Sequence, residues 1–559
     1  MAKPDVTITI QDGALGQVPA SVANAQVKFG ICSSGLPNQL YTFADIGTAQ
    51  QQLGQGPLVD AIAHTIGVAG GPVYGVPLNP TTAGGFGSVT HTGTGAGTVT
   101  PSAAPAQSIA IKITTGGTIG TFQFATSVNG AAYSTPVVTT GSPFPYLVPG
   151  TLTSITFAAG TYVLNDVYTI GTDGTKSLVG SGPAASNLTQ TSSALDNYSV
   201  VVTIGTGGAL GTATFTYSLD GGNNTGSQIA TPGGGVYVVP NTGVVLTFAS
   251  TFVAADTYSF TTTTASASNT DLTNAFTATL GSAVQWGFAH VAATPASASA
   301  AATTAATIDA QMTIAQIAYR FVFTVMECPT VEVDSTLVSA FASFASVRVC
   351  VCAGDVGALS PINGRILRRN NAWIFSAHLA AIAAGEDPAF VGSTSPPKNV
   401  VSLYPNFGST SWTPDLLDAN RFVTMRTFPG KAGYFFTNGN TMATAGSDFN
   451  LVQRRRVMDI ACTVTRSALL DYLNGSVRVS KTTGYIDERD AQKIEARVNA
   501  ILRNALVAPG FATDASIVLN RTTNLLSTNS EPVSVRVTPL AYLKTIAVTI
   551  GFSNPALAA

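Results

Sequence analysis

The sequence predicts a multidomain α+β protein in which an α/β core carries inserted all-β modules. Three features of the chain predict this fold class. An internal repeat rich in strand residues fills much of the first half, strand and helix patterns alternate after residue 283, and the charge content changes between the halves. The 559 residues leave room for about three or four domains of roughly 150 residues each.

Charge is scarce along the whole chain. Lys and Arg number 26 against 28 Asp and Glu, and charged residues make up 10% of the sequence, where about 25% is usual. This composition argues against a nucleic-acid partner bound mainly through charge. Gly, Ala, Ser and Thr take the place of the missing charges, which predicts a surface largely covered by further copies of the chain. A globular protein with a low charge content is the alternative.

The N-terminus and the cysteines indicate where the chain folds. Asp5 stands where a signal peptide would need its apolar run, so we expect folding in a reducing cytoplasm. The five cysteines are scattered and odd in number, which predicts no disulfide framework. The charge-free stretch between Asp271 and Asp309 is interrupted by Gly and Pro, so we interpret it as a strand and an Ala-rich helix without membrane insertion.

Charge divides the chain near residue 310. Residues 1–310 hold 4 Lys and Arg and 11 Asp and Glu, whereas residues 311–559 hold 22 and 17. No Arg precedes Arg320 and no Glu precedes Glu327. A shift of this size predicts a domain boundary.

The first half contains two copies of one module. Ser108–Ala158 aligns with Ser199–Ala249 at a constant offset of 91 residues. The matched pairs include Thr115–Thr121 with Thr206–Thr212, Asn129-Gly130 with Asp220-Gly221 and, at an offset of 90, Asp166 with Asp256 and Tyr168 with Tyr258.

Each copy is predicted to be a small β-sandwich or barrel. Ile109–Ile113 and Val200–Ile204 are strand-like, and the Asn-Gly and Asp-Gly pairs favour tight turns. The modules contain few ionisable groups and no Trp. We therefore interpret them as surface decoration, with adhesion or sugar binding as the alternative.

After residue 283 the pattern becomes strand, helix, strand. The predicted strands are Val284–Val291, Phe321–Met326 and Val347–Val351, and the predicted helices are Ala306–Tyr319 and Thr336–Phe344. This alternation is typical of an α/β sheet.

The end of the chain predicts two amphipathic helices followed by strands. Leu451–Asn474 and a segment that opens at Asp487 carry apolar residues at helical spacing. Val533–Thr538 and Thr545–Ile550 alternate apolar with polar or small residues, as strands do.

The usual signatures of catalysis are missing from the sequence. It contains no P-loop, H-E-x-x-H helix, EF-hand loop or G-x-S-x-G elbow, and its four histidines fall in different predicted elements. Cys328, Cys350 and Cys352 could approach one another as zinc ligands, but we interpret them as small buried residues. We expect no enzyme, and no catalytic, cofactor-binding or metal-binding residues.

Arg454, Arg455 and Arg456 stand together at the start of the first long helix. The helix dipole opposes cations at this position. Either solvent or an acidic partner must compensate them, so the two interpretations are a solvated face and a contact between subunits.

Three blocks of sequence together resemble the sheath proteins of contractile phage tails and related injection particles. The blocks are Tyr41–Ile46 with Leu53-Gly54, Pro57–Ile66 and Gly70–Leu78; Arg421–Phe436 with its Phe428-Pro429-Gly430 turn, followed by Asp448–Met458; and Tyr472–Gly475, the helix from Asp487, the break at Gly510 and the terminal strands. The resemblance covers about residues 20–80 and 280–555, and the repeats look like the variable insertion of that family.

The resemblance implies a division of the chain into seven parts. They are an N-terminal arm (1–20), an N-terminal core segment (21–82), a first inserted β module (83–187), a second inserted β module (188–275), an α/β core (276–440), a C-terminal helical and β domain (441–540) and a C-terminal arm (541–559).

The resemblance also implies that the terminal arms exchange strands with neighbouring subunits. The strand candidates are Val6, Ile8 and Ile10 at one end and Ile546, Val548 and Ile550 at the other. Pairing within the same chain is the alternative. Arg454, Arg455 and Arg456 are then candidates for a contact with the tube or a neighbour.

The function implied is that of a structural subunit in a phage tail, assembled in the host cytoplasm. Such subunits form stacked rings around an inner tail tube, meet the baseplate and tail terminator proteins, and contract to drive the tube through the host envelope. The implied partners include neither nucleic acid nor a membrane. A cell-surface or secreted adhesive protein built from β modules is the alternative.

Overall fold

The structure is a computed structural model that describes residues 23–330, 333–393, 396–405 and 413–551. The chain forms two compact units. The first comprises Met1–Ala383 with Pro388–Arg455, and the second comprises Ala384–Asp387 with Arg456–Ala559.

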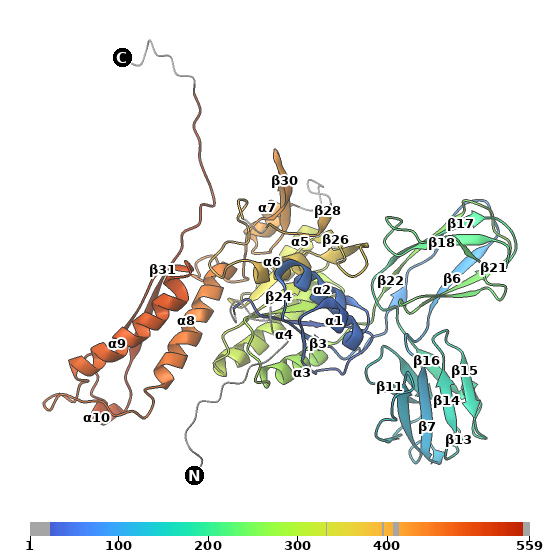
Figure 1. Cartoon of the computed structure of the whole chain (residues 1–559), viewed down its shortest axis with the longest axis horizontal. Helices are drawn as coiled ribbons and strands as arrows, with labels where there is room; N and C mark the ends of the chain where they lie inside the picture. The colour runs from blue at the N-terminus through green and yellow to red at the C-terminus, as the bar shows by residue number, and fades with distance from the viewer. Residues whose placement is uncertain (1–22, 331–332, 394–395, 406–412, 552–559) are drawn as a thin grey trace, which may run out of the picture. The chain divides into compact units, whose positions relative to one another are not determined.

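The centre of the first unit is a six-stranded sheet, of which Figure 1 labels β3 and β24. Its strands have the order β2-β3-β1-β23-β24-β25. β2 pairs antiparallel with β3, and the remaining strands are parallel. Every residue of β1, β23, β24 and β25 is buried, as a parallel sheet covered on both faces requires. The strands are β1 (Gln26–Gly30), β2 (Tyr41–Phe43), β3 (Val73–Pro77), β23 (Phe288–Ala292), β24 (Phe323–Glu327) and β25 (Val349–Cys352).

Helices cover both faces of this sheet. On one face α3 (Asn269–Leu280) and α4 (Ala298–Ile317) pack against alternate strand residues, with the Phe29 and Phe276 rings 4.3 Å apart. The other face meets α6 (Ala372–Ala381) and α2 (Pro57–Ala69). α1 (Ile46–Leu53) packs beside α2, and Asp45 caps it by accepting a hydrogen bond from the Thr48 N–H.

Shorter elements complete the core of the first unit. They are the three-stranded sheet of β26 (Asp355–Leu359), β27 (Ile366–Asn370) and β28 (Val400–Tyr404), the hairpin of β29 (Met425–Phe428) and β30 (Lys431–Phe436), and the helices α5 (Asp334–Ala340) and α7 (Pro414–Ala419). Gly430, with φ of 79°, makes the hairpin turn that the Phe428-Pro429-Gly430 sequence indicated.

The α/β order predicted after residue 283 is confirmed. The predicted strands correspond to β23, β24 and β25, and the predicted helices correspond to α4 and α5. α4 starts eight residues earlier than predicted because Ser297 caps it, its hydroxyl accepting from the Ala300 N–H, and the Ala-rich turns that follow are good helix formers.

The first β module consists of two sheets that face each other across one core. Phe124 and Phe157, on opposite sheets, lie 4.7 Å apart. One sheet has the order β10-β9-β7-β14-β15 and the other β11-β12-β16, with β8 and β13 paired beside them. The strands are β7 (Ile109–Thr115), β8 (Gly117–Thr118), β9 (Gln123–Val128), β10 (Val137–Val138), β11 (Phe144–Leu147), β12 (Ser154–Phe157), β13 (Thr161–Tyr162), β14 (Val167–Ile170), β15 (Lys176–Val179) and β16 (Leu188–Thr191).

The second β module repeats this arrangement with strands from both sides of the first in the sequence. Its sheets have the orders β19-β18-β17-β22-β4, with β5 also on β22, and β20-β21-β6. The strands are β4 (Gly85–Phe86), β5 (Thr90–Thr92), β6 (Thr98–Ala103), β17 (Ser199–Thr206), β18 (Thr214–Ser218), β19 (Ile229–Ala230), β20 (Val236–Val239), β21 (Val244–Ala249) and β22 (Thr257–Thr263).

The module boundaries therefore differ from the predicted division at 187/188. β4, β5 and β6, assigned to the first module, pair with β21 and β22 of the second, whereas β16 pairs with β12 of the first. The reason is a ladder of six residue pairs between β6 and β21, which fixes the upstream strand to the second module.

A carboxylate clasp occurs at the same place in both modules. Asp166 accepts hydrogen bonds from the N–H groups of Ser181 and Gly182. Asp256 accepts the equivalent bonds from Thr94 and Gly95. The aspartates occupy equivalent positions in the two modules. The loop that donates the hydrogen bonds follows the aspartate in the sequence of the first module and precedes it in the second.

The second unit is a pair of helices packed on a hairpin. α8 (Val452–Leu470) and α9 (Glu488–Leu502) confirm the two predicted helices, and Asp487 caps α9. β31 (Ala512–Leu519) and β32 (Val533–Pro539) form the hairpin, and the short helix α10 (Leu525–Thr528) lies in its connection. Ile494, Val498 and Ile517 belong to their shared core.

Candidate assembly site

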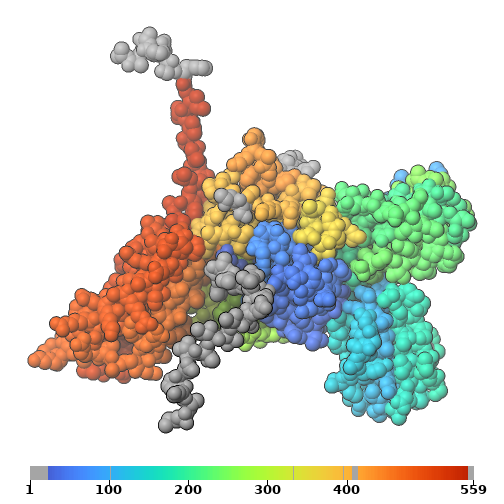
Figure 2. Space-filling view, viewed as in Figure 1, coloured from blue at the N-terminus to red at the C-terminus, as the bar shows by residue number. Residues whose placement is uncertain are grey.

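The C-terminal segment is extended and exposed. Residues 540–551 form no helix or strand, so the strand predicted at Thr545–Ile550 is absent from the single chain. Leu543, Ile546, Val548 and Ile550 expose 88, 73, 71 and 90% of their surface. Figure 2 shows the segment as a single file of residues in dark red.

The base of this segment is fastened within the second unit. The Tyr542 hydroxyl donates to the Gly385 carbonyl over 2.9 Å, and the Lys544 ammonium pairs with the Asp387 carboxylate. Residues 545–551 follow this attachment. The exposed residues Ile546, Val548 and Ile550 therefore follow directly after a segment that is fixed to the second unit.

The β31–β32 hairpin has one edge that is already occupied. The N–H groups of Ile517 and Leu519 donate to the side chains of Asn499 and Glu495 on α9, over 2.8 and 2.7 Å. These N–H groups point away from β32, so α9 caps the outer edge of β31. Among the described residues no strand pairs with the outer edge of β32, which leaves that edge open to another chain.

Ion pairs hold the hairpin against α9. Arg521, in the connection between the strands, contacts Glu488 and Glu495, both over 2.8 Å. These contacts raise the pKa of the Arg521 guanidinium and lower the pKa of both carboxyls. The hairpin that carries the open edge of β32 is thus held against α9 by these ion pairs.

The structure buries two of the three adjacent arginines. Arg455 lies over the Phe449 ring at 4.4 Å, and Arg456 is faced by Glu386. Burial lowers the pKa of Arg456 to about 10, with Glu386 acting in the opposite direction. Both side chains are buried within their own chain, which does not favour the predicted contact of Arg455 and Arg456 with a tube or a neighbour. That contact stays a prediction. Arg454 is half-buried.

The predicted N-terminal strand residues Val6, Ile8 and Ile10 lie outside the described residues. The structure brings Ile546, Val548 and Ile550 together on one exposed segment, which lies far from the three arginines in the sequence.

A buried polar chain in the central sheet was not predicted. Lys28 on β1 and His290 on β23 are paired across the strands, with Lys28 Nζ 3.1 Å from His290 Nδ1. Lys28 also donates to Ser376, and Trp373 donates to Glu327 over 2.7 Å. The signal in the sequence is an ionisable residue in the middle of each buried strand, QVKFG and FAHVA.

Burial is the main cause of the pKa shifts in this polar network. It lowers the pKa of Lys28 to about 7 and raises the pKa of Glu327 to about 7, and it lowers the pKa of His290. All three side chains are at most 2% exposed, so solutes do not reach them. The network of Lys28, His290 and Glu327 is therefore a structural part of the sheet.

A second buried cluster joins the core to the second β module. Arg369 on β27 donates to Asp60 on α2 and to Asp196, which precedes β17. Its guanidinium lies over the Trp373 ring at 4.6 Å. The two carboxylates raise the pKa of Arg369 against the effect of burial. Sequence reasoning missed this cluster because its members are far apart in the chain.

The cysteines are small buried residues, as interpreted. Cys350 and Cys352 lie on β25, beside β24 and Cys328, and all three are fully buried. Burial raises the pKa of the Cys350 and Cys352 thiols. The described part of the chain contains no group of three His, Cys, Asp or Glu residues arranged to hold a metal ion.

None of the helices within the described ranges combines the length and apolar composition that a bilayer-spanning segment requires.

Two family models together span almost the whole sequence. The model described as DUF2586, N-terminal domain, matches residues 3–440, and the model described as DUF2586, C-terminal domain, matches residues 448–557. The chain belongs to the DUF2586 family. No curated protein matches the sequence of this DUF2586 member.

The solved structures similar to the DUF2586 chain include two sheath tail proteins and a chain of a prophage baseplate. The sheath tail protein of Listeria innocua is 11% identical, with a TM-score of 0.42, and the match covers 95% of this chain and 98% of that one. The sheath tail protein of Desulfitobacterium hafniense is 11% identical, with a TM-score of 0.40, over 97% and 100%. A chain of the anti-feeding prophage baseplate is 10% identical, with a TM-score of 0.38, over 52% and 76%.

Proposed function

We propose that this chain is the structural subunit of a contractile tail sheath. Copies polymerise as stacked rings around an inner tail tube, and contraction of the lattice drives the tube through the host envelope. The exposed, alternating C-terminal segment carries the proposal, because in the described residues Ile546, Val548 and Ile550 have no strand to pair with.

Exposure of these side chains is unfavourable in a monomer. Fully burying one Ile or Val stabilises a protein by about 2 kcal/mol, and three alternate apolar residues lie on the segment within five positions. Pairing with the edge of another copy buries them and also satisfies their backbone N–H and C=O groups. The segment is therefore suited to a strand donated to a neighbour.

The outer edge of β32 is the acceptor in this proposal. Its partner edge on β31 is capped by Asn499 and Glu495, so an incoming strand has one side of the hairpin available. The arms at 1–20 and 541–559 are the donors. Both ends of each subunit then link it to neighbours by directional hydrogen bonds.

Contraction is proposed as rigid-body movement between two packings of the subunits, with the arms as tethers. No covalent step or cofactor takes part. The partners are further copies of the chain, the inner tube protein, and the baseplate and tail terminator proteins. The location is the phage tail, after assembly in the host cytoplasm.

Electron microscopy of the purified protein tests the proposal. We expect hollow tubes of uniform width from the full chain, and none after deletion of residues 1–12 or of residues 545–559. A sharper pair replaces Ile546, Val548 and Ile550 with Ser, or Thr545, Ala547 and Thr549 with Ser. The first set removes the apolar face and abolishes tubes, whereas the second set keeps it and preserves them.

The opposite outcome favours the adhesive alternative. If the full chain stays a monodisperse monomer at high concentration and over a range of salt concentrations, self-assembly is contradicted. Tubes that survive the triple apolar replacement contradict the C-terminal arm as the donor.

A further inference from the structure

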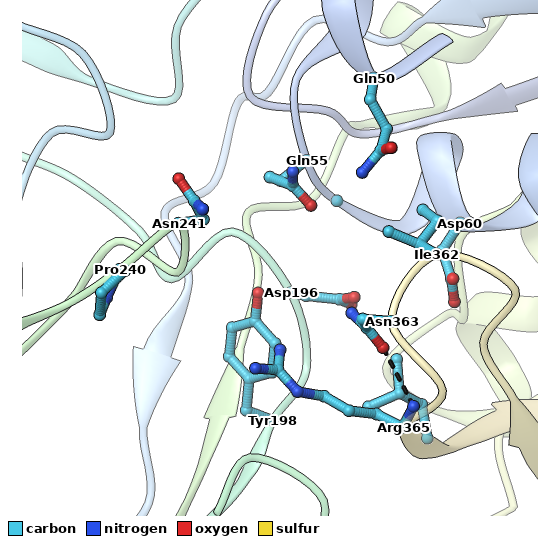
Figure 3. Close-up of a pocket in the computed structure, with 12 residues that line it drawn as sticks. Gln50, Gln55, Asp60, Asp196, Tyr198, Pro240, Asn241, Ile362, Asn363 and Arg365 are labelled. Atoms are coloured by element: carbon cyan, nitrogen blue, oxygen red, sulfur yellow. Dashed lines mark hydrogen bonds between the residues drawn. The ribbon is translucent and has the colours of Figure 1, made fainter. Parts of the chain in front are cut away.

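A polar cavity lies in the first unit where the second β module meets the core. Its volume is about 210 Å³ (Figure 3). Its walls come from α1 and the turn after it, from α2, from β27 and the loop before it, and from the segments that precede β17 and β21. This volume equals that of about seven waters at roughly 30 Å³ each. It suits a single sugar-sized molecule.

Tyr198 supplies a buried hydrogen-bonding group to this cavity. Its side chain lines the cavity, Figure 3 shows its hydroxyl directed toward the amides of Gln50 and Gln55, and the residue is 7% exposed. Among the described residues this hydroxyl makes no hydrogen bond, and Tyr198 bonds to Thr262 through its backbone N–H. Burial and the nearby Asp196 carboxylate raise the pKa of Tyr198, so the phenol keeps its proton and can donate.

Amide side chains surround the same space. Gln50, Gln55, Asn241 and Asn363 line it, and the Asn363 carbonyl accepts only from the Arg365 backbone N–H, over 3.1 Å. An amide both donates and accepts hydrogen bonds, and so does a hydroxyl group. The lining is thus complementary to a molecule with several hydroxyl groups.

The charges around the cavity cancel. Asp60 and Asp196 both line it, and both are bonded to Arg369 behind them. Arg365 is the remaining cation, so two carboxylates face two guanidinium groups. Neither an anion nor a cation is favoured by this balance.

Apolar surface completes the wall. Ile362, Leu367 and Pro240 line the cavity beside the amides. Sugar rings present C–H faces as well as hydroxyl groups, and aliphatic side chains pack against such faces. Mixed walls of this kind exclude water from one side of a bound ring.

We propose that this cavity binds a single neutral sugar unit. The site requires both the core and the second module, because Asp60 belongs to α2 whereas Tyr198 and Asn241 belong to the module. The proposal is independent of the sheath function, since it concerns a different surface from β32 and the C-terminal segment.

Saturation-transfer NMR on the full chain tests the site, with glucose, galactose, mannose and rhamnose offered one at a time. We expect transfer to at least one sugar. The variant Tyr198→Phe loses one hydrogen bond, worth about 1 kcal/mol, so we expect binding to weaken about fivefold. Asn241→Ala, at an exposed position, is expected to weaken binding similarly.

Controls separate this site from other sugar contacts. Tyr133→Phe changes an exposed tyrosine of the first module and leaves binding unaltered. Gluconate, an anionic relative of glucose, is expected to bind no better than glucose. Transfer to maltotriose as well as to glucose assigns the sugar to a glycan end, and transfer to glucose alone assigns it to a free sugar.

Three results would overturn the proposal. They are the absence of transfer to all four sugars, transfer that is undiminished in both Tyr198→Phe and Asn241→Ala, and tighter binding of gluconate than of glucose. Because Asn241 is exposed, its variant remains informative even when the Tyr198 variant does not fold.

Discussion

Lys28 occupies a position that an apolar residue usually holds. It lies in the middle of β1 with its ammonium against His290 and Ser376, and Glu327 ends the strand next to that of His290. Burying such groups costs free energy unless partners compensate for lost water. The partners in this buried network are neutral hydroxyl, imidazole and indole groups and one carboxyl. The free energy of unfolding therefore depends on which of these groups carry a proton.

Lys28 and Glu327 make stability depend on pH in opposite directions on the two sides of pH 7. The pKa of Glu327 is raised from 4.5 to about 7, so between these values the unfolded chain loses a proton that the folded chain keeps, and Glu327 makes stability fall as pH rises. The pKa of Lys28 is lowered from 10.5 to about 7, so above pH 7 the unfolded chain keeps a proton that the folded chain lacks, and stability rises. The lowered pKa values of His290 and His64 act in the opposite direction to Glu327 below pH 6.5, so the effect of Lys28 above pH 7 is the one that we test.

Urea unfolding of the wild type and Lys28→Met between pH 5 and 10 checks this. The variant removes the ammonium but keeps an unbranched side chain, so the rise above pH 7 is expected to disappear. Equal slopes above pH 7 in both proteins would contradict the assignment to Lys28.

Arg369 allows a direct comparison with its neighbour. Arg369→Met leaves Asp60 and Asp196 buried without their cation, and breaking a buried pair costs about 3–5 kcal/mol. Arg368→Met removes an ion pair with Asp355 from a side chain that is 53% exposed, which costs less than about 1 kcal/mol. Urea titrations of the two variants give the difference, and equal losses would show that the Arg369 cluster is not stabilising.

At the scale of elements, the edge of β32 gives the sharpest test of strand exchange. Since Ile517 and Leu519 direct their N–H groups away from β32, their partners Val535 and Val533 direct theirs outward too. Val535→Pro therefore removes an outward N–H and leaves the bonds to β31 in place. Proline is tolerated at such edge positions.

We expect Val535→Pro to fold as the wild type does and to form no tubes. Val535→Thr keeps the N–H and is expected to assemble normally. Circular dichroism establishes the fold and electron microscopy counts the tubes. Normal assembly of the proline variant would exclude the β32 edge as the acceptor.

Elements with local causes were predictable from the sequence. α9 begins after its Asp487 cap, and Gly430 turns the β29–β30 hairpin, because these residues act within their own segments. The terminal strand at Ile546 was predicted as a strand but has none of its hydrogen bonds in a single chain. Strand formation there depends on a partner that alternation in the sequence does not specify.

The order of strands in the β modules could not be predicted from local sequence patterns. The repeat alignment located equivalent strands at an offset of 91, but β5 and β6 precede the first module and show little similarity to β15 and β16. The available signal was the pair of Gly-x-Gly segments, Gly93–Gly95 and Gly180–Gly182, whose N–H groups meet Asp256 and Asp166. The Arg369 cluster was hidden for the same reason, because its three residues span 309 positions.

At the scale of the molecule, the two β modules form a removable insertion. The chain leaves the core at Thr82 and returns at Ser266, and these residues form an antiparallel bridge with the Ser266 N–H donating to the Thr82 carbonyl over 2.9 Å. An Asn-Gly turn can join two residues in this geometry. The sheet from β2 to β25 contains no strand from the modules.

We predict that replacing residues 83–265 with Asn-Gly yields a folded chain that still forms tubes. The arms and the β32 edge are unchanged, and Arg369 retains Asp60 as a partner. Electron microscopy and thermal unfolding check the result. A variant that folds but does not assemble would show that the modules contribute to subunit contacts, contrary to their interpretation as decoration.

The nested strand order of the second module has a consequence for protein synthesis. β6 leaves the ribosome before its partner β21 exists, and the roughly 140 residues from Ala103 to Val244 take on the order of ten seconds to translate. During that interval β12, the repeat counterpart of β21, emerges first and offers β6 a similar edge. β16 follows β12 after some 30 residues and belongs to the same module. Correct folding therefore requires β12 to pair with β16, which is synthesised later but is nearer in the sequence, and not with β6, which is synthesised earlier.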